Sequence, residues 1–160
     1  MDQPQHRVEL SRRVQAPPSA VWEVLTDLDR AQERLSQVTH LHVITDGPYA
    51  LGTRWLETRR MMGASDTQEM VVVENNPLRS TTTEAVDGGT RYRTTLLLES
   101  LDESAATLLT VRFSADVADP NRLQRLALRV VGPLGLKLTE KSLRTELDDI
   151  AAAAEALHRG

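Results

Sequence analysis

Residues 90–117, TRYRTTLLLESLDESAATLLTVRFSADV, contain two runs that alternate between apolar and polar side chains on either side of the turn-forming stretch LDES. Alternation with a period of two is typical of β-strands that bury one face. Two such strands joined by a short turn predict an antiparallel hairpin. The sets expected to face the core are Tyr92, Thr94, Leu96 and Leu98 on the first strand, and Leu109, Val111, Phe113 and Ala115 on the second.

The strand pattern extends back from this hairpin to residue 38. Short turn-forming stretches separate the segments, and parallel pairing would require crossovers of about a dozen residues or more. The region therefore predicts a meander of six antiparallel strands. The four that precede the hairpin are VTHLHVIT (38–45), TRWLETRRM (53–61), TQEMVVVE (67–74) and RSTTTEAV (79–86).

Two of the predicted strands open with nearly the same letters, GTRW at 52–55 and GTRY at 89–92. A glycine loop that cradles phosphate would be followed by a helix, but here a strand follows each glycine. The flanking sequences differ, which disfavours a structural repeat. We interpret Gly52 and Gly89 as hairpin exits that need positive φ angles.

Helical periodicity is confined to the two ends of the chain. After a strand-like stretch at 6–15, prolines precede a helical stripe, and a second short helix is predicted over about 30–37. A C-terminal helix is predicted to start at Asp119 and to be interrupted at GPLG (132–135). Its second part is about 22 residues, or about 33 Å, long, which is enough to cross a whole sheet.

The composition excludes several classes of function. A net charge of -4 and a pI near 5.6 give no basic face for nucleic acid, and 3% aromatic residues are too few for a base-stacking platform. The absence of cysteine excludes disulfides, thiolate metal sites and a cysteine nucleophile. No apolar run is long enough to span a membrane, and the polar N-terminus lacks a secretory h-region, so a cytoplasmic protein is expected.

The order of strand, two short helices, six strands and long helix is accompanied by four characteristic stretches. These are VQAPPSAVWEVLTDLD (14–29), LGTRWLETRR (51–60), DGGTRYRTT (87–95) and LRTELDDIAAAAEAL (143–157). Together they resemble the helix-grip fold of the SRPBCC (START-like) superfamily and, within it, are most similar to the polyketide cyclase/dehydrase and lipid-transport family. The resemblance implies an α+β fold in which a curved antiparallel sheet wraps around the C-terminal helix, with one domain over 1–160 and its core at 6–158.

A curved sheet cannot stay in contact with one straight helix along its whole length, so a cavity is expected between them. Apolar cavities of this kind usually bind hydrophobic small molecules. The segment 120–138 is expected to form a flap over the mouth of the cavity. The candidate ligand-binding residues are Trp55, Arg59, Met70, Thr82, Glu84, Tyr92, Thr94, Phe113, Leu126 and Val130.

The orientation of WLETRR (55–60) is ambiguous from the sequence. If Trp55, Glu57 and Arg59 face the cavity, Glu57 could act as a general base or pair with Arg59. The favoured interpretation is a solvated outer face of alternating charges with Leu56 inward, because one bulge reverses the parity of a strand.

The strand RSTTTEAV (79–86) is polar on both faces. An edge-like or water-lined strand explains this pattern as well as a wet pocket wall does. In the second case, hydroxyl groups within 81–83 would contact an oxygenated ligand.

No metal site or cofactor is expected. His40 and His42 lie two residues apart, a spacing that permits metal binding on a strand, but no third ligand is indicated. There is also no GxSxG nucleophile signature.

The leading hypothesis is therefore a protein that binds a hydrophobic small molecule such as a lipid or polyketide. The alternatives are a polyketide cyclase or aromatase, in which Glu57 or Tyr92 would assist proton transfer, and a protein-interaction module. The fold does not choose among these functions.

Overall fold

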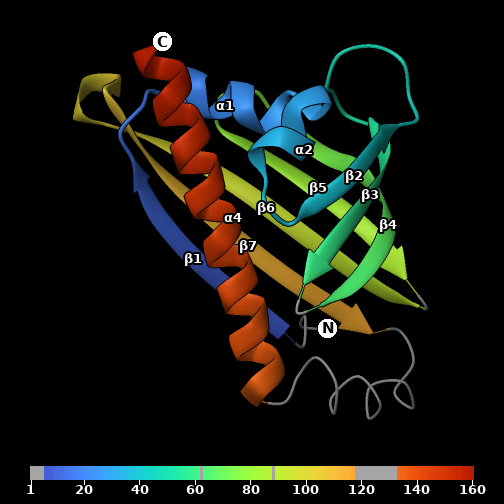
Figure 1. Ribbon diagram of the computed structural model, residues 1–160. Helices are drawn as coiled ribbons and strands as arrows, with labels where there is room; N and C mark the ends of the chain where they lie inside the picture. Colours follow the sequence, from blue (N-terminus) through green and yellow to red (C-terminus); the bar gives the residue numbers. More distant parts are fainter. Residues whose placement is uncertain (1–5, 62, 88, 118–132) are drawn as a thin grey trace.

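The computed structural model describes residues 6–61, 63–87, 89–117 and 133–160 (Figure 1). Within these residues, seven antiparallel strands form one sheet in the spatial order β1-β7-β6-β5-β4-β3-β2. The predicted six-strand meander is confirmed, and the N-terminal strand joins it beside the last one. The strands are β1 (His6–Val14), β2 (Val38–Val43), β3 (Arg54–Met61), β4 (Ala64–Asn76), β5 (Ser80–Asp87), β6 (Thr90–Leu101) and β7 (Ala106–Val117).

Two short helical stretches connect β1 to β2. Helix α1 (Pro18–Thr26) starts with Pro18 in its first turn, where the missing N–H costs no hydrogen bond. The predicted second helix is shorter than expected. It consists of the 3-10 turn η1 (Leu28–Arg30) and one α-helical turn, α2 (Ala31–Arg34).

The C-terminal helix α4 (Pro133–Arg159) is described from within the GPLG stretch onward. The predicted start at Asp119 and most of the predicted flap (120–138) lie outside the described residues. Within α4, the predicted stripe is buried at Leu143, Leu147, Ile150 and Ala154, with Ala151 beside it. These side chains recur every three or four residues, so one face of the helix is apolar.

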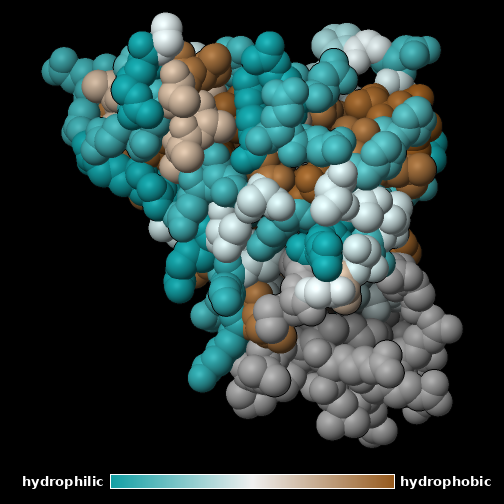
Figure 2. All heavy atoms as spheres, viewed as in Figure 1, coloured by the Kyte–Doolittle hydropathy of each residue, from teal (hydrophilic) through white to brown (hydrophobic). Residues whose placement is uncertain are grey.

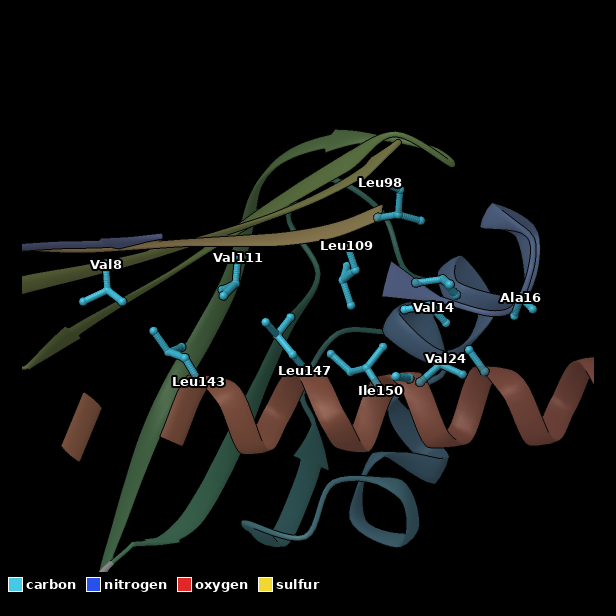
Figure 3. Close-up of a cluster of buried hydrophobic side chains, with 14 residues drawn as sticks. Val8, Val14, Ala16, Val24, Leu98, Leu109, Val111, Leu143, Leu147 and Ile150 are labelled. Atoms are coloured by element: carbon cyan, nitrogen blue, oxygen red, sulfur yellow. The ribbon is translucent and has the colours of Figure 1, made fainter. Parts of the chain in front are cut away.

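The sheet curves around α4, and the core lies between them (Figure 1). Figure 3 shows Leu143, Leu147 and Ile150 pointing from α4 towards the sheet, where Leu109 and Val111 of β7 lie. In Figure 2, the side of α4 turned to the viewer is hydrophilic over the middle of the helix and pale brown nearer its C-terminus, where the sequence is rich in alanine. This is the helix-grip arrangement that the sequence predicted.

Polar contacts fix α4 against the N-terminal elements. Arg12 of β1 pairs with Asp148, and the backbone N–H of Gln15 donates to Glu155 Oε1 at 3.0 Å. The backbone N–H and hydroxyl of Ser36 both donate to Asp149 Oδ2, at 2.8 and 2.7 Å. The helix is therefore held on its polar side as well as through its apolar stripe.

The two repeated glycines are hairpin exits, as predicted. Gly52 has φ +89° and Gly89 has φ +86°. Nothing lies within 4 Å of a Cβ added at Gly52, so the left-handed backbone rather than crowding explains the glycine there.

No helix among the described residues is long and apolar enough to cross a lipid bilayer.

Candidate functional site

A cavity of about 430 Å³ lies between the sheet and α4. Its walls come from α1, α2, η1, α4 and strands β2 to β7, with Tyr49 from the loop between β2 and β3. Most of the lining is apolar, as expected for a site that buries an organic molecule. The apolar lining consists of Val24, Leu25, Leu28, Ala31, Leu35, Leu41, Trp55, Ala64, Met70, Ala85, Leu96, Phe113, Leu143 and Ile150.

Six of the ten candidate ligand-binding residues line this cavity: Trp55, Arg59, Met70, Tyr92, Thr94 and Phe113. Their contact with a ligand stays a prediction. Leu126 and Val130 lie outside the described residues.

Thr82 and Glu84 do not line the cavity, and this corrects the prediction. They lie on the other face of β5, where Thr82 Oγ1 is 2.9 Å from Thr95 Oγ1 and Arg93 Nη1 donates to Glu84 Oε1 at 3.3 Å. Because β5 is polar on both faces, its alternation does not indicate which face is buried. The cavity is lined instead by the residues of opposite parity, Thr81, Thr83 and Ala85.

The favoured orientation of β3 was also wrong. Trp55, Glu57 and Arg59 face the cavity, whereas Leu56 points to the outer face and is 38% exposed. The pairing of β3 with β4 runs without a shift from Arg54 to Met61, so no bulge reverses the parity along this strand.

A charged network connects β3 to α4 inside the cavity. Glu57 is only 8% exposed and accepts a hydrogen bond from Trp55 Nε1 at 3.0 Å. Its other oxygen accepts from Arg59 Nε. Arg59 reaches across to α4 and donates to both oxygens of Glu146, at 2.9 and 3.2 Å. This bidentate pair fixes the guanidinium more firmly than a single contact would.

The electrostatics of Arg59 are set by two opposing effects. Burial disfavours its charged form, but the carboxylates of Glu146 and Glu57, together with their hydrogen bonds, outweigh that cost and raise the pKa of Arg59. The guanidinium therefore stays charged at every pH at which the protein is folded.

Aromatic side chains form two further parts of the wall. The rings of Tyr49 and Trp55 lie 6.2 Å apart, and the Tyr49 hydroxyl is 2.6 Å from Thr81 Oγ1. On β6 and β7, the rings of Tyr92 and Phe113 stack with centroids 6.2 Å apart. Offset or tilted ring pairs at such distances are favourable.

Comparison with known proteins agrees with this architecture. The family described as "Polyketide cyclase / dehydrase and lipid transport" matches residues 5–155. The chain belongs to this family. A search of curated proteins found no significant match.

Solved structures from several bacteria share the fold of this family member. A protein from Thermus thermophilus is 19% identical with a TM-score of 0.75, over 95% of this chain and 99% of that one. The Zhui aromatase/cyclase from Streptomyces sp. R1128 is 16% identical with a TM-score of 0.75, over 94% and 93%. A START superfamily protein from Mycobacterium smegmatis is 16% identical with a TM-score of 0.70, over 96% and 97%.

Sequence reasoning missed several polar residues that line the site of this polyketide cyclase/dehydrase and lipid-transport family member, among them Tyr49, Asp66 and Glu146. Tyr49 belongs to a turn-forming stretch, and Glu146 belongs to a helix rich in charged residues. The role of both residues depends mainly on contacts with strands that are distant in the sequence. For Glu146, an acidic side chain one residue before the buried Leu147 of the apolar stripe was the available clue.

The two histidines considered as metal ligands, His40 and His42, lie on β2. Both are exposed. Throughout the part of the chain that the structure describes, no group of three or more His, Cys, Asp or Glu residues is placed to hold a metal ion.

Titration of Tyr49 gives a first testable prediction. Burial raises the pKa of Tyr49 above its ordinary value of 10.0, and the hydrogen bond with Thr81 offsets only part of that rise. The fold thus favours the neutral phenol, so its contribution to stability is full below pH 10 and is lost as the pH rises through the folded-state pKa. An absorbance titration of tyrosinate should extend to higher pH for the wild type than for Tyr49→Phe.

The same titration of the two proteins in urea serves as the control, since burial is then absent. The prediction is contradicted if Tyr49→Phe removes a tyrosine that ionises at its ordinary pH in the folded protein.

Proposed function

We propose that this protein binds a hydrophobic small molecule, such as a lipid or a polyketide, in the cavity between the sheet and α4. The observation that carries the proposal is the cavity of about 430 Å³ with mostly apolar walls. Ligand sites of roughly 300–1,000 Å³ with apolar linings and a few polar groups are typical of small-molecule binding. Membership of a family that includes lipid-transport proteins supports the same function.

Polar groups at defined places would orient the ligand. Thr83 and Thr94 line the cavity on neighbouring strands, and β5 pairs with β6 so that they lie opposite each other. Hydroxyls both donate and accept hydrogen bonds, which suits oxygen atoms of a lipid or polyketide. These residues would give specificity, while the apolar walls would give most of the affinity.

Native mass spectrometry of the purified protein, followed by organic extraction, tests the proposal directly. A bound small molecule that is lost on denaturation is the expected result. Mass spectra of the apoprotein only, combined with no measurable binding of hydrophobic probes, would contradict it.

A cavity-filling variant sharpens this test. Thr83→Phe places a large ring where the ligand would lie, so we expect at least a tenfold loss of affinity for the extracted molecule, measured by calorimetry. Val86→Phe on the same strand is the matched control, because Val86 is 68% exposed on the outer face. Equal affinities for the two variants would place binding outside this cavity.

A polyketide cyclase is the second candidate. It is supported by the family and by Glu57 and Tyr92, which both line the cavity and could assist proton transfer while the walls hold a flexible chain for closure. Glu57→Gln should then abolish cyclisation of a poly-β-ketone substrate without a large change in melting temperature. Unchanged turnover in this variant would exclude Glu57 as the base.

A cytoplasmic location stays a prediction.

A further inference from the structure

The cavity has two chemically different ends. Towards the hairpin between β3 and β4, it is lined by Glu57, Arg59 and Asp66, together with Glu146 from the middle of α4. Towards α1, which lies beside the C-terminal half of α4, it is lined by Val24 and Leu25 (Figure 1). The ligand that matches both ends is an amphiphile, with its polar head at the charged end and its tail against α1.

The charged end carries an excess of negative charge. Among the lining residues that the structure describes, there is one guanidinium against three carboxylates, which leaves a formal charge of -2. No lysine or histidine is part of this lining. Asp66 lies directly opposite Arg59 in the pairing of β3 with β4, so the third carboxylate adjoins the network rather than lying elsewhere in the cavity.

The single positive charge is already engaged. Arg59 donates from Nε to Glu57 and from both terminal nitrogens to Glu146, so two carboxylates surround it. A ligand with a carboxylate or phosphate head would have to displace one of these carboxylates or lie beside them. Either arrangement is unfavourable in a partly buried site, where charges are screened less than in water.

We propose that the ligand carries a protonated amine head, bound at the end of the cavity formed by Glu57, Arg59, Asp66 and Glu146. An ammonium group has three donors and no acceptor, which complements carboxylate oxygens. Asp66 is exposed, so this end of the cavity lies nearest to the surface and the head remains partly hydrated. The inference rests on the proposed function, because it specifies the chemistry of the molecule that the cavity binds.

Three probes with the same ten-carbon chain test the inference. Decylamine, decanol and decanoate differ only in the head, and at neutral pH the first is cationic and the last anionic. Calorimetric titration below their aggregation concentrations should show decylamine binding at least tenfold more tightly than decanol, and decanoate most weakly. Trp55 provides a second readout, because its ring lines the cavity and its emission should change on binding.

If decanol or decanoate binds as tightly as decylamine, the inference of an amine head is contradicted, while the proposed function is unaffected. Failure of all three probes to bind would overturn the proposed function, and this inference with it.

Asp66→Asn separates a specific charge effect from a general one. It removes one negative charge from an exposed side chain, so the fold should be unaffected, and the preference for decylamine over decanol should fall several-fold. Asp148→Asn is the matched control, since Asp148 pairs with Arg12 outside the cavity lining and carries the same charge. An equal change of preference in both variants would contradict binding of the head at this end of the cavity.

Discussion

Replacing Arg59 by methionine is expected to lower the free energy of unfolding by about 3–5 kcal/mol, the usual cost of removing one partner from a buried ion pair. Methionine keeps most of the volume of arginine. The carboxylates of Glu57 and Glu146 then repel each other, because no cation lies between them. Glu57 is buried, so water cannot replace the lost guanidinium at little cost. Urea denaturation at neutral pH, followed by circular dichroism, measures the change.

Two variants control this prediction. Arg54→Met removes the partner of Glu69 in an exposed pair on the same strand, where a loss of about 1 kcal/mol or less is expected. Combining Arg59→Met with Glu57→Gln and Glu146→Gln should recover much of the stability, because no uncompensated charge remains. If Arg59→Met costs no more than Arg54→Met, the network is not a structural element of the cavity.

Leu147→Ala is expected to cost about 3 kcal/mol, within the range for truncating a buried leucine. Leu147 is 2% exposed and lies in the middle of the stripe that packs α4 against the sheet (Figure 3). Truncation removes apolar contacts at a point where the helix cannot shift, because polar contacts on both sides hold it. For a chain of this length the melting temperature should fall by roughly 10 °C.

Leu56→Ala is the comparison, because Leu56 is a leucine on the outer face of β3 and does not line the cavity. A change of about 0.5 kcal/mol or less is expected there. Similar losses for Leu147→Ala and Leu56→Ala would mean that the apolar face of α4 contributes little to stability.

Local periodicity predicted most of the fold. The alternation in β6 and β7 and the stripe along α4 identified their buried faces, because each element buries one side against the same core. Turn signals placed the hairpins, and the positive φ angles at Gly52 and Gly89 confirm two of them. The pairing of β1 with β7 was not predicted, because nothing in the sequence of either strand identifies its partner.

The orientation of polar strands could not be read in the same way. For β3, both faces carry charge, so the choice between Leu56 and Glu57 as the inward residue had no hydrophobic basis. The inward orientation of Glu57 and Arg59 depends on a contact that is distant in the sequence. Arg59 of β3 donates a hydrogen bond to Glu146 of α4, 87 residues later. For β5, both faces carry hydroxyl groups, so the sequence does not distinguish Thr82 from Thr83. Only the packing of the neighbouring strands shows that Thr83 faces the cavity.

The order of the strands along the chain determines when the cavity between the sheet and α4 can form during synthesis. Val14 in β1 pairs with Thr107 in β7, so β1 leaves the ribosome roughly 90 residues before its partner. At about 5–20 residues per second, that interval lasts about 5 to 20 s. Helix α4 emerges later still, and it supplies the wall that carries Glu146. The nascent chain therefore has no enclosed cavity until α4 has left the ribosome, so loading with a ligand follows the synthesis of α4.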